Sequence, residues 1–114
     1  MPTSGDVVRL DLGSPSGREA GFRHPAVLVT AQRILDASPN VIHVVPLTSA
    51  ARGFGSEVSI EPDARNGLGH TSAAQCQHIR AVSTDRVEEV SGNVGPLVLA
   101  QIRETIGLIL DLPG

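Results

Sequence analysis

Aromatic residues, cysteine and lysine are scarce or absent in this sequence, and each shortage excludes a class of protein. The 114 residues include one cysteine and two phenylalanines, with no tryptophan and no tyrosine. A single cysteine cannot form a disulfide within the chain, which fits a reducing compartment. Two phenylalanines leave little surface on which unpaired bases could stack, so an aromatic platform for single strands is not expected.

Positive charge is limited in amount and in kind. The chain has nine basic residues, all of them arginine, against twelve acidic residues, and its formal net charge is −3. A broad, nonspecific nucleic-acid binder would carry a basic face or tail, so this class is excluded. A local phosphate site built from a few arginines remains compatible with the composition, because a guanidinium group binds phosphate in a bidentate manner and stays charged.

Long apolar runs are absent as well. No segment approaches the roughly 20 consecutive apolar residues that cross a bilayer. Residues Met1–Asp6 have neither the basic stretch nor the apolar core of a signal peptide. We therefore expect one cytoplasmic domain spanning residues 1–114, without a membrane partner.

Six segments show the alternation or the continuous apolar runs that are typical of β-strands. They are Asp6–Leu12, Pro25–Thr30, Val41–Leu47, Glu57–Glu61, Ala73–His78 and Ile79–Val82. Between the first two, the polar and glycine-rich stretch from Gly13 to His24 is expected to be a loop. Asn66-Gly67 is a strong turn signal.

One helix is expected near the C-terminus. Gly95-Pro96 opens it, since proline suits the first helical position. Apolar residues then recur at helical spacing, at Val98, Ile102, Ile106 and Ile109. The pattern predicts a mainly β fold with α: a small barrel of five to seven strands with this helix packed on it.

The most suggestive group of polar residues is Glu19, Arg23 and His24, at the end of the expected loop. Cleavage of RNA without a metal needs a base for the 2′-OH, an acid for the 5′-oxygen and a cation for the negative charge of the transition state. The alternative is that Glu19 and Arg23 form a surface ion pair and His24 is a solvated loop residue. The residues alone leave both interpretations open.

Two further groups have a functional and a structural interpretation. Hydroxyls at the strand end Thr48-Ser49 can hold a phosphate oxygen or cap a turn, and Arg52-Gly53 just beyond fits the second use. The segment Gln75–Arg80 could read bases or bind phosphate, or be the solvent face of a strand. Cys76 within it is expected to be a small core residue. The four histidines lack the spacing of a metal site, so no metal or cofactor is expected.

Several of these segments occur in an order that resembles the MazF/Kid (PemK-like) toxins. The resemblance covers nearly the whole chain and is carried by Gly5–Val8, Gly17–Val29, Val44–Ser49, Arg52–Val58, Asn66–Leu68, Gln77–Arg80 and the C-terminal helix. It implies an SH3-like (CcdB/Kid/MazF-type) barrel that forms a homodimer. It also implies a metal-independent endoribonuclease, an mRNA interferase that cuts single-stranded RNA, with a cognate MazE-like antitoxin whose acidic tail covers the RNA groove.

Two rival functions are compatible with the same fold. One is a CcdB-type toxin that inhibits gyrase, and the other is a catalytically inactive module that binds RNA or an antitoxin. Thr48 and Glu19, which match residues of the nuclease family, favour the nuclease.

The resemblance also assigns roles to residues. In the family, an arginine just before the strand proline and a threonine at the end of the next strand carry cleavage. Thr48 matches that threonine, but here His24 occupies the arginine's slot and Arg23 lies one place earlier. Either Arg23 turns back into the site or His24 has taken over part of the arginine's role. We expect Arg23, His24 and Thr48 to form one catalytic site. The residues expected to bind RNA or support the site are Glu19, Ser49, Gln75, Gln77, His78 and Arg80.

Overall fold

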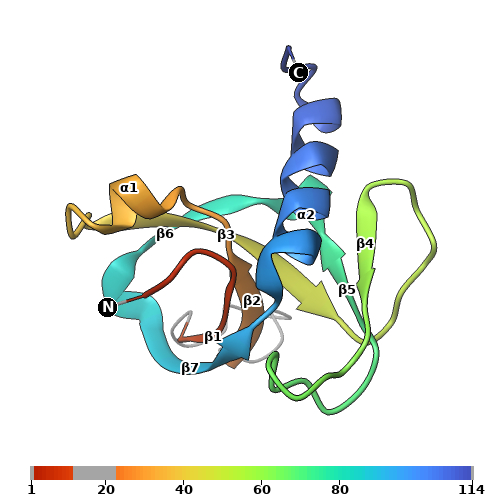
Figure 1. The fold of residues 1–114 in the computed structure, drawn as a ribbon, viewed down its shortest axis with the longest axis horizontal. Coiled ribbons are helices and arrows are strands. Elements are labelled where there is room, and N and C mark those ends of the chain that lie inside the picture. Colours follow the sequence, from red (N-terminus) through yellow and green to blue (C-terminus); the bar gives the residue numbers. More distant parts are fainter. Residues whose placement is uncertain (1, 12–22, 114) are drawn as a thin grey trace, which may run out of the picture.

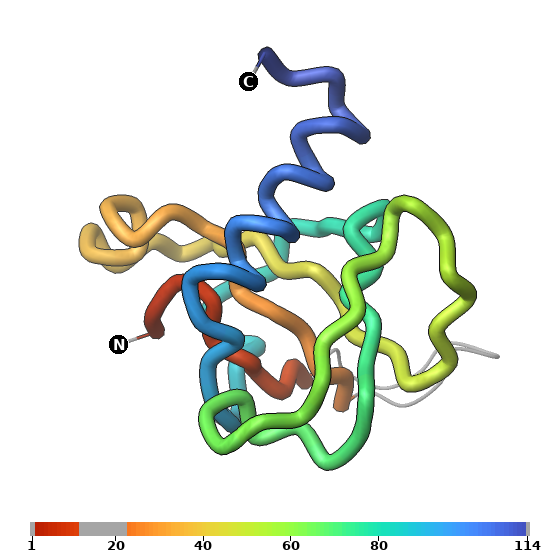
Figure 2. The backbone as a smooth tube through the Cα atoms, turned by 45° about the vertical axis from the view of Figure 1, so that its right-hand side comes forward, coloured from red at the N-terminus to blue at the C-terminus, as the bar shows by residue number. Residues whose placement is uncertain are grey.

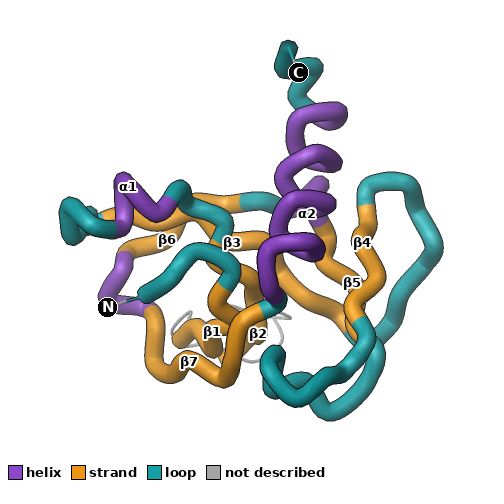
Figure 3. The backbone as a smooth tube through the Cα atoms, in the orientation of Figure 1, coloured by secondary structure: helices purple, strands orange, loops and turns teal. Residues whose placement is uncertain are grey.

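The computed structural model describes residues 2–11 and 23–113 (Figure 1). Its strands are β1 (Asp6–Asp11), β2 (Arg23–Leu28), β3 (Val41–Thr48), β4 (Glu57–Ile60), β5 (Ser72–Gln75), β6 (Arg80–Ser83) and β7 (Val87–Asn93). Its helices are α1 (Gln32–Leu35) and α2 (Gly95–Ile109), with short 3₁₀ helices at η1 (Cys76–His78) and η2 (Thr84–Arg86) (Figure 3). The expected supporting residue Glu19 lies outside the described residues.

The predicted architecture is confirmed. The structure is mainly β, with seven strands in its described part and one long helix near the C-terminus. That helix begins at Gly95 with a proline in its first turn, as the Gly95-Pro96 signal predicts.

Three local expectations are wrong. Arg23 and His24 belong to strand β2 and not to the preceding loop, because they pair with Asp11 and Leu10 of β1. The expected strand Ala73–His78 stops at Gln75, where the chain turns into η1, and the next strand is displaced to Arg80–Ser83. Sequence patterns also missed α1 and β7.

The connection between β6 and β7 closes the sheet into a barrel. The sheet order in the described chain is β4-β5-β3-β2-β1-β7, and β6 pairs with the first half of β3. β6 and β7 therefore stand at opposite ends of the path β6-β3-β2-β1-β7, yet only the three residues of η2 join them. Since three residues span at most about 10 Å, the five strands must curl until these ends approach each other, as Figure 3 shows.

The central strands are buried on both faces, which is why they read as continuous apolar runs. One core fills the barrel and consists of Val8, Leu10, Ala26, Leu28, Leu35, Ile42, Val44 and Val82. The other lies under α2 and includes Val7, Val27, Val45, Leu47, Val58, Ile60, Ala74, Cys76, Ile102 and Ile106. Consecutive residues such as Val7 and Val8 serve different cores, because neighbouring side chains on a strand point to opposite faces.

The helix α2 covers one face of the sheet with its first half and projects beyond the body of the molecule with its last turns (Figures 1 and 2). Ile102 and Ile106 are buried against the strands, whereas Ile109, expected on the same stripe, is exposed because the helix has passed the edge of the sheet. The projecting end carries the exposed side chains Leu108, Ile109, Leu110 and Leu112. In the described chain, every helix is too short or too polar to cross a membrane.

Packing of α2 on the sheet can be tested with Ile102, whose side chain is fully buried. We expect Ile102→Ala to lower the free energy of unfolding by about 2–5 kcal/mol, because truncation loses apolar burial and leaves a cavity. Leu97→Ala on the same helix, at an 81% exposed position, should change it by no more than about 0.5 kcal/mol. Urea denaturation measures both, and equal losses would contradict the packing described here.

Candidate functional site

The pairing of β2 with β3 brings His24 and Thr48 together. In this antiparallel pair, Ala26 stands opposite Pro46 and Leu28 opposite Val44. The pairing ends at Ala26 and Pro46, and His24 and Thr48 lie two residues beyond this last pair on their strands. Residues opposite each other share a face of the sheet. Ala26 and Val44 belong to the core inside the barrel, so alternation along the two strands places His24 and Thr48 on that same face.

His24 and Thr48 line a pocket of about 250 Å³ at the open end of that face. The other lining residues are Pro25, Leu47, Ser49, His70 and Ser72. The pocket is formed across three neighbouring strands, since Ser72 belongs to β5, which pairs with the end of β3. His70 and Ser72 were missed by sequence analysis, because the connection from β4 to β5 places them there and no local motif marks it.

The environment of His24 favours a neutral imidazole. Burial lowers the pKa of His24 below its ordinary value of 6.5, a hydrogen bond to the backbone of Leu47 raises the pKa, and the positive charge of Arg80 lowers it; the net direction is downward. A hydrogen bond that raises the pKa must be accepted by the Leu47 carbonyl from an imidazole N–H. The second ring nitrogen is then an acceptor, which suits a general base.

The hydroxyl of Thr48 is oriented by the turn that follows it. Its Oγ1 accepts a hydrogen bond from the backbone N–H of Ala50 at 3.0 Å, so the turn-capping interpretation of this residue is confirmed. Glu57 holds the rest of the loop, because its Oε1 accepts hydrogen bonds from the backbone N–H groups of Arg52 and Gly53 at 2.9 and 3.0 Å. Capping uses the oxygen of Thr48 as an acceptor and leaves its hydrogen available for donation.

Arg23 is not among the residues that line the pocket. It precedes His24 on β2, and neighbouring residues on a strand point to opposite faces. Its Nε lies 3.1 Å from Oε1 of Glu88 on β7, and its side chain is 66% exposed. Glu88 is thus the ion-pair partner of Arg23 among the described residues, and the alternative pairing of Arg23 with Glu19 lies outside them.

The segment from Gln75 to Arg80 is divided between two environments. Arg80, at the start of β6, acts electrostatically on His24 and also lines a second pocket of about 260 Å³ with Arg86 and Ser83. Gln75 of β5 stands opposite Glu57 of β4. Ala73, two residues earlier and on the same face of β5, stands opposite Thr48 of β3. Gln75 is not among the residues that line the first pocket.

The 3₁₀ helix η1 separates the remaining residues of that segment. Gln77 is half-buried, and in the described structure its Oε1 has no hydrogen-bond partner, while His78 is exposed. Cys76 is fully buried in the core under α2, and burial raises the pKa of its thiol to about 11. The interpretation of Cys76 as an inert core residue is therefore confirmed.

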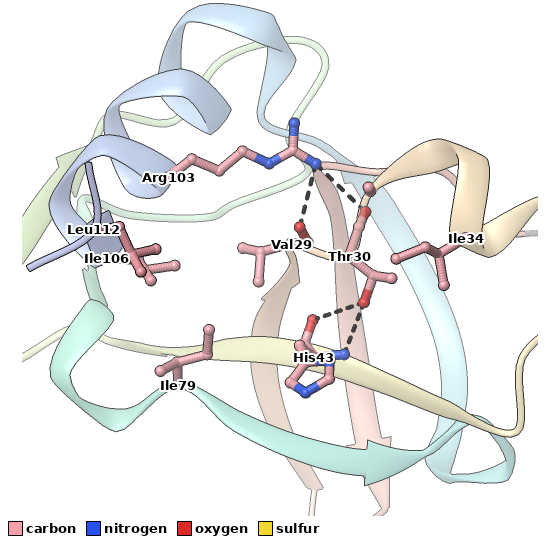
Figure 4. Close-up of a pocket in the computed structure, with 9 residues that line it drawn as sticks. Val29, Thr30, Ile34, His43, Ile79, Arg103, Ile106 and Leu112 are labelled. Carbon is pink, nitrogen blue, oxygen red and sulfur yellow. Dashed lines mark hydrogen bonds between the residues drawn. The ribbon is translucent and has the colours of Figure 1, made fainter. Parts of the chain in front are cut away.

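A third pocket, of about 370 Å³, lies between the end of α2 and the β2–β3 edge (Figure 4). Its lining is mostly apolar and includes Ile34, Ile79, Ile106 and Leu112. Arg103 from α2 reaches over it and donates hydrogen bonds to the backbone oxygens of Val29 and Thr30. This pocket is on a different side of β3 from His24, and none of the expected site residues lines it. In the part of the chain that is described, no three His, Cys, Asp or Glu side chains gather as metal ligands.

Comparison with known proteins gives a consistent set of relatives. A family model described as PemK-like, MazF-like toxin of type II toxin–antitoxin system matches residues 3–110. The chain is 33% identical to the endoribonuclease MazF9 of Mycobacterium tuberculosis, over 98% of each protein. The crystal structure of MazF (Form-I) from Deinococcus radiodurans is 27% identical, with a TM-score of 0.75 and 96% of each chain covered.

A mycobacterial endoribonuclease in complex with its cognate antitoxin shares the fold. It is 22% identical, with a TM-score of 0.78, over 100% of this chain and 99% of that one.

The downward shift of the His24 pKa predicts how stability depends on pH. The unfolded chain takes up this proton near the ordinary pKa of 6.5, before the folded protein does. The free energy of unfolding should therefore fall as the pH is lowered from about 7 to about 5, and part of that fall should vanish in His24→Gln. Urea denaturation across this range measures the effect, with the exposed His43→Gln as control. An unchanged pH dependence in His24→Gln would contradict this environment.

Proposed function

Because the chain belongs to the family of PemK-like, MazF-like toxins of type II toxin–antitoxin systems, we propose that it is an endoribonuclease that cleaves single-stranded RNA. The observation that carries the proposal is the shared pocket of His24 and Thr48. It combines a titratable imidazole with a hydroxyl donor, at the strand positions where family members carry cleavage. A ribonuclease of this kind works in the cytoplasm, where its substrate is.

The residues divide the chemistry as follows. The acceptor nitrogen of His24 removes the proton of the RNA 2′-OH, and the resulting oxygen attacks the adjacent phosphorus. The hydroxyl of Thr48 donates to a phosphate oxygen as negative charge develops on it. Arg80, whose charge acts on His24, supplies the cation. None of these steps requires a metal ion.

Arg23 has a different part in this proposal from the one its sequence position implies. Its guanidinium group is engaged by Glu88, so it can reach a phosphate at Thr48 only after releasing that carboxylate. We assign it to RNA or antitoxin binding on the face of β2 opposite the pocket. Ser49, Gln75, Gln77 and His78 remain candidates for contacts with the bases.

The partner of this protein is, by the same proposal, a MazE-like antitoxin. Carboxylates of an acidic antitoxin segment would compete with RNA phosphates, because both fit the guanidinium fork of Arg80 or Arg23. Structural neighbours include a MazE–MazF complex from Deinococcus radiodurans, 25% identical with a TM-score of 0.78.

A homodimer is also part of the proposal. The projecting end of α2 exposes apolar side chains beside the pocket drawn in Figure 4. A second copy that covered this face would remove that apolar surface from water.

The proposed activity is tested by incubating the purified protein with a long single-stranded transcript in the presence of EDTA. We expect fragments that end in a 2′,3′-cyclic phosphate and begin with a 5′-OH. Gyrase inhibition without RNA fragments would instead support a CcdB-type toxin. Binding of RNA without fragments would support an inactive binding module.

Thr48 provides the matching pair of variants. Thr48→Ala should lower kcat by about 10²–10³-fold, because it removes one positioned donor to the transition state. Thr48→Ser keeps the hydroxyl and should retain most of the activity. Single-turnover cleavage of a mapped RNA site measures both, and equal activity of Thr48→Ala and the parent protein would exclude this role.

The role of Arg80 predicts a salt effect. Loss of one phosphate contact should reduce the slope of log Kd against log salt concentration by about 0.7 for single-stranded RNA. We expect this change for Arg80→Ala, measured by fluorescence anisotropy with an RNA that carries a 2′-deoxy residue at the cleavage site. Arg65→Ala, at an exposed position outside both polar pockets, is the charge-matched control. Identical slopes for the two variants would refute the contact.

A further inference from the structure

The pocket around Thr48 contains a second histidine, His70. His24 comes from β2, and His70 comes from the residues just before β5. In the sheet, β3 lies between these two strands. His24 and His70 thus come from elements on the two sides of β3, and both line the pocket that contains Thr48.

The segment that carries His70 is built around one buried residue. Asn66 is 1% exposed, although it lies in a polar turn. Its Nδ2 donates to the backbone oxygen of Glu61 at 2.8 Å, and its Oδ1 accepts hydrogen bonds from the N–H groups of Leu68 and Asp63 at 3.0 and 3.2 Å. One side chain thus closes both ends of the turn.

The same segment is tied to β7 and to β5. The backbone oxygen of Arg65 accepts a hydrogen bond from the N–H of Asn93 at 2.9 Å. Gly92 of β7 packs so closely on the turn that a Cβ there would overlap Arg65 and Asn66. At the other end, the hydroxyl of Ser72 donates to the backbone oxygen of His70 at 3.2 Å. The side chain of His70 is exposed. The hydrogen bonds of its segment nevertheless hold its backbone in place, as a reacting group requires.

Two histidines that reach one pocket from the two sides of β3 suit the geometry of RNA cleavage. The attacking 2′-oxygen and the departing 5′-oxygen stand roughly in line, on opposite sides of the phosphorus. A phosphate bound to the Thr48 hydroxyl would present the first oxygen to one imidazole and the second to the other. The attacking side needs a base and the departing side needs an acid.

We propose that His70 is the general acid of this site and donates a proton to the departing 5′-oxygen. The inference rests on the proposed ribonuclease function. A nitrogen of His24 takes the proton of the 2′-OH while the 2′-oxygen bonds to phosphorus. The bond from phosphorus to the 5′-oxygen breaks, and that oxygen receives the proton of the His70 imidazolium. The products are a 2′,3′-cyclic phosphate and a 5′-OH, and solvent restores both histidines.

The experiment compares two RNA oligonucleotides that contain one mapped cleavage site. One has the natural 5′-oxygen at that site and the other has sulfur in its place, because a thiolate leaves without protonation. On the natural RNA, His70→Ala should lower kcat by about 10²–10⁴-fold. On the sulfur RNA, the decrease in kcat caused by His70→Ala should be less than about tenfold. The kcat of His24→Ala should remain severely reduced on both RNAs.

Controls separate chemistry from structure. His70→Gln keeps a polar side chain and should behave as His70→Ala does, with thermal unfolding unchanged from the parent. His43→Ala, at an exposed position outside this pocket, should cleave both RNAs at the parent rate. Equal losses on the two RNAs, or no loss, would overturn the role of His70. If the parent protein cleaves neither RNA, the proposed function is wrong and the inference falls with it.

Discussion

The pairing register of β2 and β3 is the constraint on which the site depends. Where β2 and β3 pair, their residues are buried or half-buried on both faces, so their apolar pattern alone would tolerate a shifted register. A polar contact at one end removes that freedom. The hydroxyl of Thr30 accepts a hydrogen bond from the backbone N–H of His43 at 2.8 Å. The backbone N–H of Val29 donates a hydrogen bond to the backbone oxygen of His43 at 3.0 Å. With this end fixed, His24 and Thr48 both line the same pocket at the other end. A shift of one residue would turn one of them out of the pocket.

The strands and the helix could be predicted because burial leaves a periodic record in the sequence. Elements without that record were missed. β7 is one of them, since its residues are mostly exposed and its pairing with β1 is interrupted by two register shifts. The site residue His70 was missed as well. It lies in a loop whose position depends on the hydrogen bonds of Asn66 and on the contact with Gly92. Both come from segments remote in sequence, and alternation does not report them.

Local placement of charge compensates for the acidic composition. The chain has a net charge of −3, yet two arginines, Arg80 and Arg86, line one pocket, and the charge of Arg80 acts on His24. Acidic groups near the site have structural partners: Glu88 pairs with Arg23, and Glu57 accepts two backbone N–H groups from the loop after Thr48. A carboxylate held in this way does not compete for the arginines that would face a phosphate. A chain of negative net charge can therefore still present a local binding site for an anion.

The order of Arg23 and His24 follows from the same electrostatics. Position 24 is half-buried and lies within the field of Arg80. A guanidinium group there would carry a second permanent charge into a partly desolvated site beside the first, which is unfavourable. An imidazole can stay neutral under these conditions. Burial and the charge of Arg80, which would both disfavour a cation at this position, both lower the pKa of His24 and so favour its neutral form. The permanent charge is instead placed on the neighbouring residue, whose side chain points to the other face of β2 and meets Glu88. The order Arg-His in place of His-Arg thus separates a proton acceptor inside the pocket from a fixed cation outside it.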